Sequence, residues 1–326
     1  MAVDWLSLNR GENFRTAKTF YRYLGGNATN VAVGMARLGL DSALVSRVGD
    51  DIHGRYLLEK LQDECVDASF VSMDPVYPTA QCYMTSRLDG TPEYLNWPSP
   101  SASKSLRVEH VPESIYAQSW IWHTAAVTLI ARPRREALME ILLRAVSENK
   151  ILSFDGCFPE VESEGGRKAA YALMEKADII KINLAELRYW SNTSDDSTIA
   201  KMVETLSKHI NPSALLIITL AESGAELWKG GANLFCPPYK VESIGDVGPG
   251  DGFASGLIYG LSLINNGFCR KEQMQRLSLQ DWLEIAHYGA VAGAMVTRSR
   301  SATESFPQLD ELLEAVNTHS KMGAAD

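Results

Sequence analysis

The sequence lacks the features that mark membrane-spanning and exported proteins. No run of apolar residues reaches the roughly 18 that a membrane-spanning helix needs. The opening segment, MAVDWLSLNRGENF, contains neither the basic segment nor the apolar core of a signal peptide. We therefore expect no membrane partner and no export.

Cysteine is scarce, and its spacing excludes a zinc site or a disulfide framework. The cysteines are odd in number and far apart, and no CxxC pair occurs among Cys65, Cys82, Cys157, Cys236 and Cys269. Such a pattern is typical of reduced, mostly buried thiols, so the sequence predicts a cytoplasmic location.

Positive charge is also in short supply. The chain has 31 Lys and Arg against 40 Asp and Glu, which gives a formal net charge of −9. This balance argues against nucleic acid or an anionic membrane as the main partner. A small phosphorylated ligand remains compatible, because backbone N–H groups at a helix N-terminus bind anions whatever the overall charge.

Apolar segments rich in β-branched residues alternate with amphipathic helical patterns. The segments with strand character are 43–48, 120–127, 151–154, 178–182 and 214–219, and those with helical character include 30–38 and 133–149. This alternation predicts an α/β fold with a doubly wound, mostly parallel sheet and helices on both faces.

Two further segments, at about 5–24 and 77–98, alternate polar and apolar residues instead. The second contains Asp89-Gly90, a hairpin signal. We interpret them either as a small β-strand lid or as a surface hairpin that caps a sheet edge. The sequence thus predicts one α/β domain over residues 1–318, with the lid strands inserted, and a frayed tail at 319–326.

The most informative segment is glycine-rich and precedes a helix with an apolar stripe: IGDVGPGDGF, residues 244–253. Gly248 and Gly250 let the backbone approach a ligand closely, and Pro249 suits a first helical turn. The helix N-terminus adds unpaired N–H groups and a partial positive charge, so the segment is a candidate pocket for a phosphoryl group. Asp251 either complements the helix dipole or serves as a general base for a hydroxyl proton.

A second glycine cluster, GGNATN at residues 25–30, also precedes a helix. It has neither the GxGxxG spacing of a dinucleotide fold, which disfavours an oxidoreductase, nor the GKS or GKT of a P-loop. Its polar residues either cap the helix, through Asn27 or Thr29, or hydrogen-bond a polyhydroxylated ligand.

The two clusters, in this order, resemble the signatures of the ribokinase/PfkB family of sugar kinases. The first signature continues through Gly39 and into VGDDIHG at 48–54, and the second, usually written DTxGAGDxFxxG, corresponds to 245–256. Between them, ADIIKINLAE at 177–186 resembles the family's NxxE element and TLAESG at 219–224 its TLGxxG element. Two other stretches, at 123–134 and 292–307, are similar to the fructokinase and 2-keto-3-deoxygluconate kinase branch.

This resemblance implies ATP-dependent phosphorylation of a hydroxyl of a small sugar, such as the ketose fructose or a keto-deoxy sugar acid. It implies that Asp251 is the catalytic base and that the backbone of Gly248, Pro249 and Gly250 lines the anion hole. It assigns the nucleotide and Mg²⁺ to Asn183, Glu186, Thr219 and Gly224, with Glu186 reaching the metal through water. It assigns the sugar to Asp4, Gly25, Gly26 and Asn30, and it suggests a homodimer through the lid strands.

The sequence departs from the family pattern at several positions. The family has further residues ahead of Asp4, so the first core strand is expected to be altered. Gly245 replaces an aspartate, which argues against the monovalent cation (K⁺) site that the family pattern implies, and Ala221 replaces a glycine. The DxNxR element reads Asp155-Gly-Cys157-Phe-Pro159 without its arginine, which disfavours a carboxylate on the substrate. A catalytically weak sugar- or nucleotide-binding protein and a nucleoside kinase remain alternatives.

Overall fold

The computed structural model describes residues 1–88, 92–97, 99–157, 164–194, 196–245, 247–299 and 303–322. The chain divides into two compact units. Unit 1 consists of Met1–Leu106, Tyr239–Tyr259 and Val291–Asp326, and unit 2 of Arg107–Pro238 and Gly260–Ala290. Two helices, α8 (Pro249–Ser262) and α10 (Leu279–Val296), contribute residues to both units.

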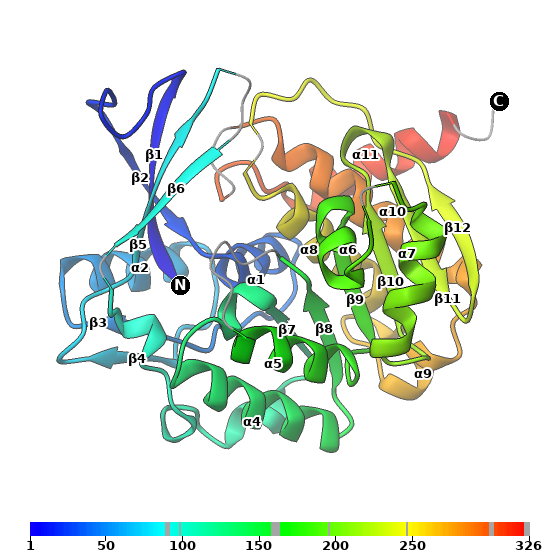
Figure 1. Cartoon of the computed structure of the whole chain (residues 1–326), viewed down its shortest axis with the longest axis horizontal. Helices are drawn as coiled ribbons and strands as arrows, with labels where there is room; N and C mark the ends of the chain where they lie inside the picture. The colour runs from blue at the N-terminus through cyan, green and yellow to red at the C-terminus, as the bar shows by residue number, and fades with distance from the viewer. Residues whose placement is uncertain are drawn as a thin grey trace. The chain divides into compact units, whose positions relative to one another are not determined.

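The sheet of unit 2 has six strands in the order β12-β11-β10-β9-β8-β7 (Figure 1). Strands β7 to β10 run parallel, whereas β11 and β12 are antiparallel to their neighbours. Their bounds are β7 (Ile121–Ala125), β8 (Ile151–Asp155), β9 (Ile179–Asn183), β10 (Leu215–Thr219), β11 (Ala225–Lys229) and β12 (Ala232–Cys236). Every residue of β8 is buried, as expected for a parallel strand covered on both faces.

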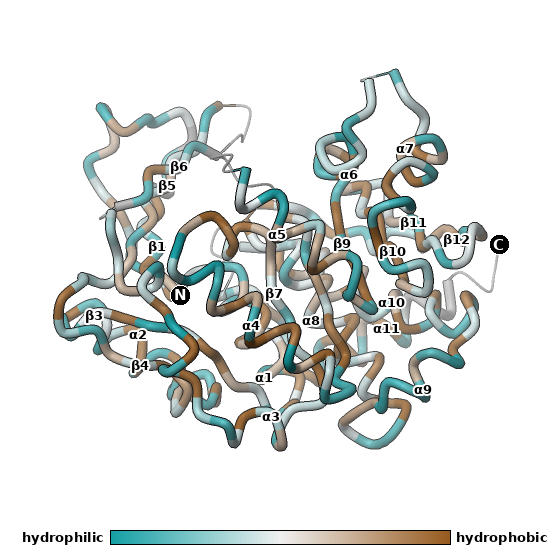
Figure 2. Tube along the Cα trace, turned by 60° about the horizontal axis from the view of Figure 1, so that its bottom comes forward, coloured by the Kyte–Doolittle hydropathy of each residue, from teal (hydrophilic) through white to brown (hydrophobic). Residues whose placement is uncertain are grey.

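Helices alternate with the parallel strands of unit 2, as the sequence predicts, and further helices flank this region. They are α3 (Ser114–Gln118), α4 (Arg134–Ser147), α5 (Glu164–Met174), α6 (Leu184–Ser191), α7 (Ile199–Leu206) and α9 (Lys271–Gln275). Figure 2 shows hydrophobic and hydrophilic residues alternating along α4, which packs on β8. The 3-10 turns of this unit are η2 (Val108–His110), η3 (Ala126–Leu129), η4 (Ser207–His209), η5 (Ala221–Ser223) and η6 (Leu263–Asn265).

Unit 1 contains a four-stranded sheet in the order β2-β1-β5-β6. It is formed by β1 (Ala2–Arg10), β2 (Tyr21–Gly25), β5 (Gln81–Ser86) and β6 (Pro92–Trp97). These strands come from the two segments that the sequence analysis set apart, although Asp89-Gly90 lies outside the described residues. That they act as a lid stays a prediction, and so does the single-domain boundary at residue 318.

The strand expected at 43–48 lies outside the sheet of unit 2. It forms β3 (Ser46–Gly49), which pairs in parallel with β4 (Val71–Asp74) in a two-stranded sheet. The helices of unit 1 are α1 (Asn27–Arg37), α2 (Ile52–Asp63), α11 (Leu309–Met322) and the N-terminal part of α8, with the 3-10 turn η1 (Ala102–Lys104). Helix α11 continues to Met322, past the expected start of the tail, and 323–326 lie outside the described residues.

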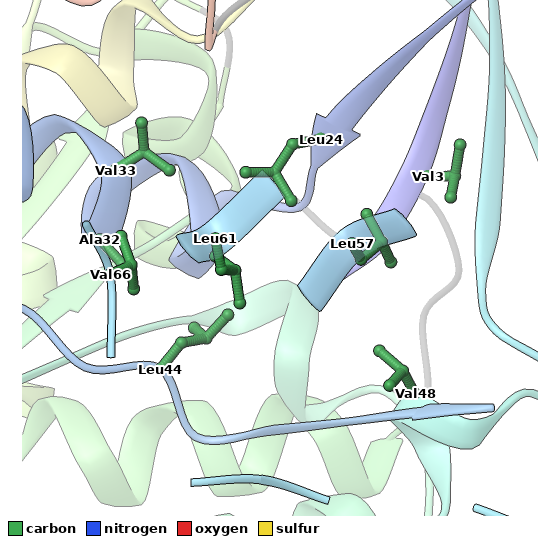
Figure 3. Close-up of a cluster of buried hydrophobic side chains, with 9 residues drawn as sticks. All are labelled: Val3, Leu24, Ala32, Val33, Leu44, Val48, Leu57, Leu61 and Val66. Carbon is green, nitrogen blue, oxygen red and sulfur yellow. The ribbon is translucent and has the colours of Figure 1, made fainter. Parts of the chain in front are cut away.

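Apolar side chains from β1, β2, α1 and α2 form the core of unit 1 (Figure 3). The cluster comprises Val3, Leu24, Ala32, Val33, Leu44, Val48, Leu57, Leu61 and Val66. Leucine-to-alanine changes at such positions typically cost about 2–5 kcal/mol. This core therefore fixes the junction of β2 and α1, where the first glycine cluster lies. Among the described residues, no helix is both long and apolar enough to cross a bilayer.

Candidate active site

Asp251 lies in the first turn of α8 and is buried. The preceding Gly248 has φ +84°, a conformation that favours glycine, and its carbonyl accepts the Gly252 N–H at 2.9 Å. Pro249 occupies the first helical position, where its missing N–H is of least consequence. The first N–H groups of a helix generally have no intrahelical acceptor, so this turn has the geometry expected of an anion site.

Glycines hold the N-terminus of α8 close to the end of α10. A Cβ on Gly252 would lie 2.7 Å from Val296 Cγ2, and a Cβ on Gly293 would lie 2.8 Å from the Pro249 carbonyl oxygen. Any larger residue at either position would push the helices apart. The backbone around Asp251 is therefore positioned by close helix packing rather than by loop contacts alone.

Two asparagines of α1 hold the Asp251 carboxylate. Asn27 Nδ2 donates to Oδ1 at 2.5 Å, and Asn30 Nδ2 donates to Oδ2 at 2.8 Å. The amide oxygens of both asparagines are buried and have no hydrogen-bond partner among the described residues. Leaving a polar group buried and unpaired costs about 1–3 kcal/mol. Both amides therefore direct their N–H groups at Asp251, and this contact is what the described residues show them to make.

The proposed sugar-binding residues converge at the start of α1. Gly26, with φ +104°, is the N-cap of this helix and makes no side-chain capping bond, so capping by Asn27 or Thr29 was the wrong alternative. A Cβ on Gly25 would lie 2.0 Å from the carboxyl carbon of Asp4, so only glycine fits beside that side chain. Burial raises the pKa of Asp4 to about 7, against the opposing effects of the positive amino terminus and the Gly26 N–H.

The residues assigned to the nucleotide lie in unit 2, at the carboxyl ends of its parallel strands. Asn183 ends β9 and caps α6: its Oδ1 accepts the Glu186 N–H, and Glu186 Oε2 accepts the Asn183 N–H, each at 2.8 Å. This reciprocal pair is a capping box. Thr219 ends β10 directly opposite Asn183, so the fold brings these two positions together.

Gly224 follows the same strand end and has a backbone that only glycine suits. Its φ is +99°, and a Cβ there would lie 2.4 Å from the Cys236 carbonyl oxygen. Ala221, where the resemblance expects glycine, also has a positive φ of 52°. The turn between β10 and β11 thus requires left-handed backbone at two positions but has glycine at only one of them.

A family model described as pfkB family carbohydrate kinase matches residues 2–309. The chain belongs to this family. The predicted family, the α/β fold and the activity class of an ATP-dependent sugar phosphotransferase are thereby confirmed.

Relatives of this pfkB carbohydrate kinase include fructokinase-1 of Zea mays, 27% identical over 324 residues, which cover 97% of this chain and 95% of the relative. Fructokinase-1 of Oryza sativa subsp. japonica is 27% identical over 326 residues, covering 98% and 96%. Among solved structures, an uncharacterized sugar kinase from Pyrococcus horikoshii in complex with ATP has a TM-score of 0.80 at 26% identity, covering 97% and 96%.

The fold is also that of the fructokinase with bound ATP from Xylella fastidiosa, with a TM-score of 0.86, 23% identity and coverage of 98% and 96%. The fructokinase of Vibrio cholerae O395 was solved with fructose, ADP and either potassium or calcium ion. The predicted use of ATP, a divalent ion and a possible monovalent cation agrees with these bound species. Asp246, which follows the replaced aspartate position at Gly245, lies outside the described residues.

No group of three or more His, Cys, Asp or Glu side chains suited to a metal occurs in the described part of this pfkB kinase. Mg²⁺ in kinases is usually held by one or two carboxylates together with substrate phosphates and several waters. A single carboxylate, Glu186, at the edge of the assigned nucleotide site fits that mode of binding. Its role at the metal stays a prediction.

The sequence analysis missed a buried ion pair in unit 2. Lys181 Nζ lies 3.0 Å from Asp155 Oδ2, and both side chains are buried at adjacent positions of β9 and β8. The lysine within the apolar run Ile-Ile-Lys-Ile was the available signal. On β7, His123 Nδ1 contacts Ser153 Oγ at 3.0 Å, and burial lowers the pKa of His123 to about 4, so this histidine is neutral at pH 7.

Asn27 is the second residue whose role the sequence analysis missed. It lies three positions before Asn30, and residues at this spacing share one face of a helix. That spacing was the available signal, but the contact with Asp251 depends on how α1 packs on α8. Phe158 and Pro159, of the altered DxNxR element, lie outside the described residues.

Proposed function

We propose that this chain phosphorylates a ketose, fructose in the first instance, with Mg-ATP as the phosphoryl donor. The observation that carries the proposal is the Asp251 carboxylate, buried in the first turn of α8 and held by two amides. A helix dipole needs no such support, because an exposed first-turn carboxylate complements it equally well. The fructokinase names of the relatives support the choice of sugar.

Asp251 accepts the proton of the sugar hydroxyl as that oxygen attacks the γ-phosphorus of ATP. The backbone from Gly248 through Pro249 and Gly250 forms the anion hole, which stabilises the charge that develops on the transferred group. Phosphoryl transfer needs positioning and charge stabilisation more than covalent chemistry, and a rigid helix N-terminus provides both.

The sugar binds at the start of α1. The Asp4 carboxylate and the Asn30 side chain hold its hydroxyls, while Gly25 and Gly26 let the ligand approach the backbone. The absence of an arginine in the altered DxNxR element favours a neutral ketose over a keto-deoxy sugar acid.

The nucleotide binds unit 2 through Asn183, Thr219 and Gly224. Bound Mg²⁺ supplies neutralisation of the phosphate charge, and Glu186 holds it through water. Asn183 and Thr219 support this assignment because parallel strands place ligand-binding residues at their carboxyl ends.

The four-stranded sheet of unit 1 acts as the lid that keeps water from the reaction, and it forms the contact surface of a homodimer. Its partly exposed Tyr21, Tyr94 and Leu95 support an apolar contact of this kind. The chain works in the cytoplasm, in keeping with five free cysteines. Its partners are the sugar and ATP, with no nucleic acid or membrane.

A coupled ADP-release assay tests the proposal. The panel contains fructose, ribose, 2-keto-3-deoxygluconate, 5-keto-2-deoxygluconate and adenosine, each with and without K⁺. We expect turnover with fructose, and the Asp251→Asn variant measures the background. Turnover with adenosine alone would identify a nucleoside kinase. Binding of fructose and ATP without turnover would identify the catalytically weak alternative.

A further inference from the structure

We propose that Asn27 is a positioning residue for the catalytic base, acting through its amide group on Asp251 Oδ1. This inference rests on the proposed function. It adds a residue to the reaction, because the sugar and nucleotide assignments do not include Asn27.

The contact is long-range and converges on one group. Asn27 and Asn30 lie in the first turn of α1, three residues apart and on one helix face. Their Nδ2 atoms donate to opposite oxygens of Asp251, at 2.5 and 2.8 Å, across 224 and 221 residues of sequence. One donor leaves a carboxylate free to rotate about its own bond axis. Two donors on opposite oxygens fix the plane of the group.

The orientation of both amides follows from chemistry. An ionised carboxylate only accepts hydrogen bonds, so each asparagine must direct its NH2 group to Asp251 and its oxygen away. These oxygens, Asn27 Oδ1 and Asn30 Oδ1, have no partner among the described residues. Among the described residues, the contact with Asp251 is thus the side-chain hydrogen bond that the Asn27 amide makes.

The helices that carry these groups pack closely enough to transmit the constraint. A Cβ on Gly34 of α1 would lie 2.3 Å from Ser255 Oγ of α8. Ser255 Oγ itself is within 3.3 Å of the Val31 carbonyl oxygen and 2.8 Å of the Asp251 carbonyl oxygen. Ser255 thus joins the same two helices without touching the Asp251 carboxylate, which makes it a matched control.

The test compares Asn27→Leu, which keeps the approximate shape and removes the amide, with Ser255→Ala. For Asn27→Leu we expect kcat to fall about 10- to 100-fold while the KM for ATP stays within about twofold. For Ser255→Ala we expect a lower Tm with kcat nearly unchanged. A fall in Tm for Asn27→Leu without loss of kcat, measured well below Tm, would mean a structural role and overturn the inference.

A double-mutant cycle separates action through Asp251 from independent action. On the residual activity of Asp251→Asn, adding Asn27→Leu should have an effect of no more than about twofold, because the group that it positions is gone. Losses that multiply would overturn the inference. If Asn27→Leu does not fold, the smaller Asn27→Ala takes its place under the same criteria, since it removes the donor without placing a second charge beside Asp251.

The outcomes also separate this inference from the proposed function. A wild-type chain that phosphorylates fructose while Asn27→Leu, or Asn27→Ala in its place, retains full kcat overturns the positioning role alone. A wild-type chain that turns over no sugar removes the proposed function and the positioning role with it.

Discussion

Each unit contains an arrangement of asparagine and carboxylate side chains. The two arrangements differ in the sequence separation of the residues involved. In unit 2, Asn183 and Glu186 are three residues apart and satisfy each other's backbone N–H groups in a capping box. In unit 1, Asn27 and Asn30 reach Asp251 from another helix, more than 200 residues away in sequence. The first pairing builds a helix end. The second contacts a carboxylate from both sides, and its two amide oxygens have no partner within the described part of the chain.

We interpret the difference as one between a pairing that stabilises the protein and a pairing that serves the proposed chemistry. A capping box stabilises the helix end at which it forms, because both side chains accept hydrogen bonds from N–H groups that have no acceptor within the helix. The Asp251 arrangement carries a cost in unpaired oxygens. Natural proteins tend to break local rules of this kind at functional sites.

The largest effect on kcat is expected from replacing Asp251, the carboxylate that both asparagines of unit 1 contact. If Asp251 is the base, Asp251→Asn should lower kcat by about 10²–10⁴-fold. ADP binding should be unchanged, because the residues assigned to the nucleotide belong to unit 2. Steady-state kinetics and ADP titration calorimetry measure the two quantities. A kcat within tenfold of wild type would show that another group takes the proton.

The second prediction concerns Asp4, the other carboxylate of unit 1. Because burial raises its pKa to about 7, the carboxylate form is the minor one below pH 7 and the major one above it. If sugar hydroxyls donate to the carboxylate, the KM for the sugar should fall as pH rises from about 5.5 to 8. Asp4→Asn should raise this KM about tenfold or more and abolish its pH dependence.

The same shift has the opposite sign for stability. The folded-state pKa of Asp4 lies above the unfolded value, so proton uptake favours the folded state below about pH 4, and this contribution is lost as pH rises through 7. Substrate binding and stability should therefore respond to pH in opposite directions. A sugar KM independent of pH in the wild type would contradict the assignment of Asp4.

The third prediction separates the two roles of Glu186. Glutamine also completes a capping box, so Glu186→Gln should leave Tm nearly unchanged while it removes the charge. If Glu186 holds Mg²⁺ through water, the Mg²⁺ concentration for half-maximal rate should rise about 10-fold or more. Glu186→Ala serves as the comparison, because it should also lower Tm. An unchanged Mg²⁺ requirement in Glu186→Gln would leave the residue with its capping role only.

Local patterns predicted much of the fold. The buried runs that became β9 and β10 are long, apolar and β-branched, and their boundaries follow from that composition. The sequence correctly predicted a strand near 43–48, but the prediction that it joins the large sheet was wrong. Its partner, β4, is set by tertiary packing around α2 that periodicity does not encode.

The candidate site divides in the same way. Gly248, Gly224 and Gly26 stand out in the sequence as glycines within motifs. In the structure each has a positive φ angle, which favours glycine. Two side-chain contacts could not be predicted from the sequence. They join Asn27 to Asp251 and Lys181 to Asp155, and each depends on which helices or strands become neighbours. Sequence spacing alone carries no information on that adjacency.

The smallest expected effect is on the free energy of unfolding and comes from backbone strain at Ala221 in unit 2. Unlike the changes at Asp251 and Asp4 in unit 1, it concerns stability alone. Ala221 has φ 52°, a conformation that costs a residue with a Cβ about 1–2 kcal/mol. Ala221→Gly removes that strain but gives the unfolded chain more freedom, so the free energy of unfolding should rise by only about 0.5–1 kcal/mol. Urea denaturation measures this change.

Two glycines of the same unit provide the controls for Ala221→Gly. Gly230→Ala places a Cβ at φ 59° with nothing within 4 Å, so it reports backbone strain alone and should be mildly destabilising. Gly224→Ala adds a contact of 2.4 Å with the Cys236 carbonyl oxygen and should be worse. A destabilised Ala221→Gly beside a destabilised Gly230→Ala would mean that the Ala221 methyl group makes a contact worth more than the strain. The departure from the family's glycine would then be a packing feature of this chain.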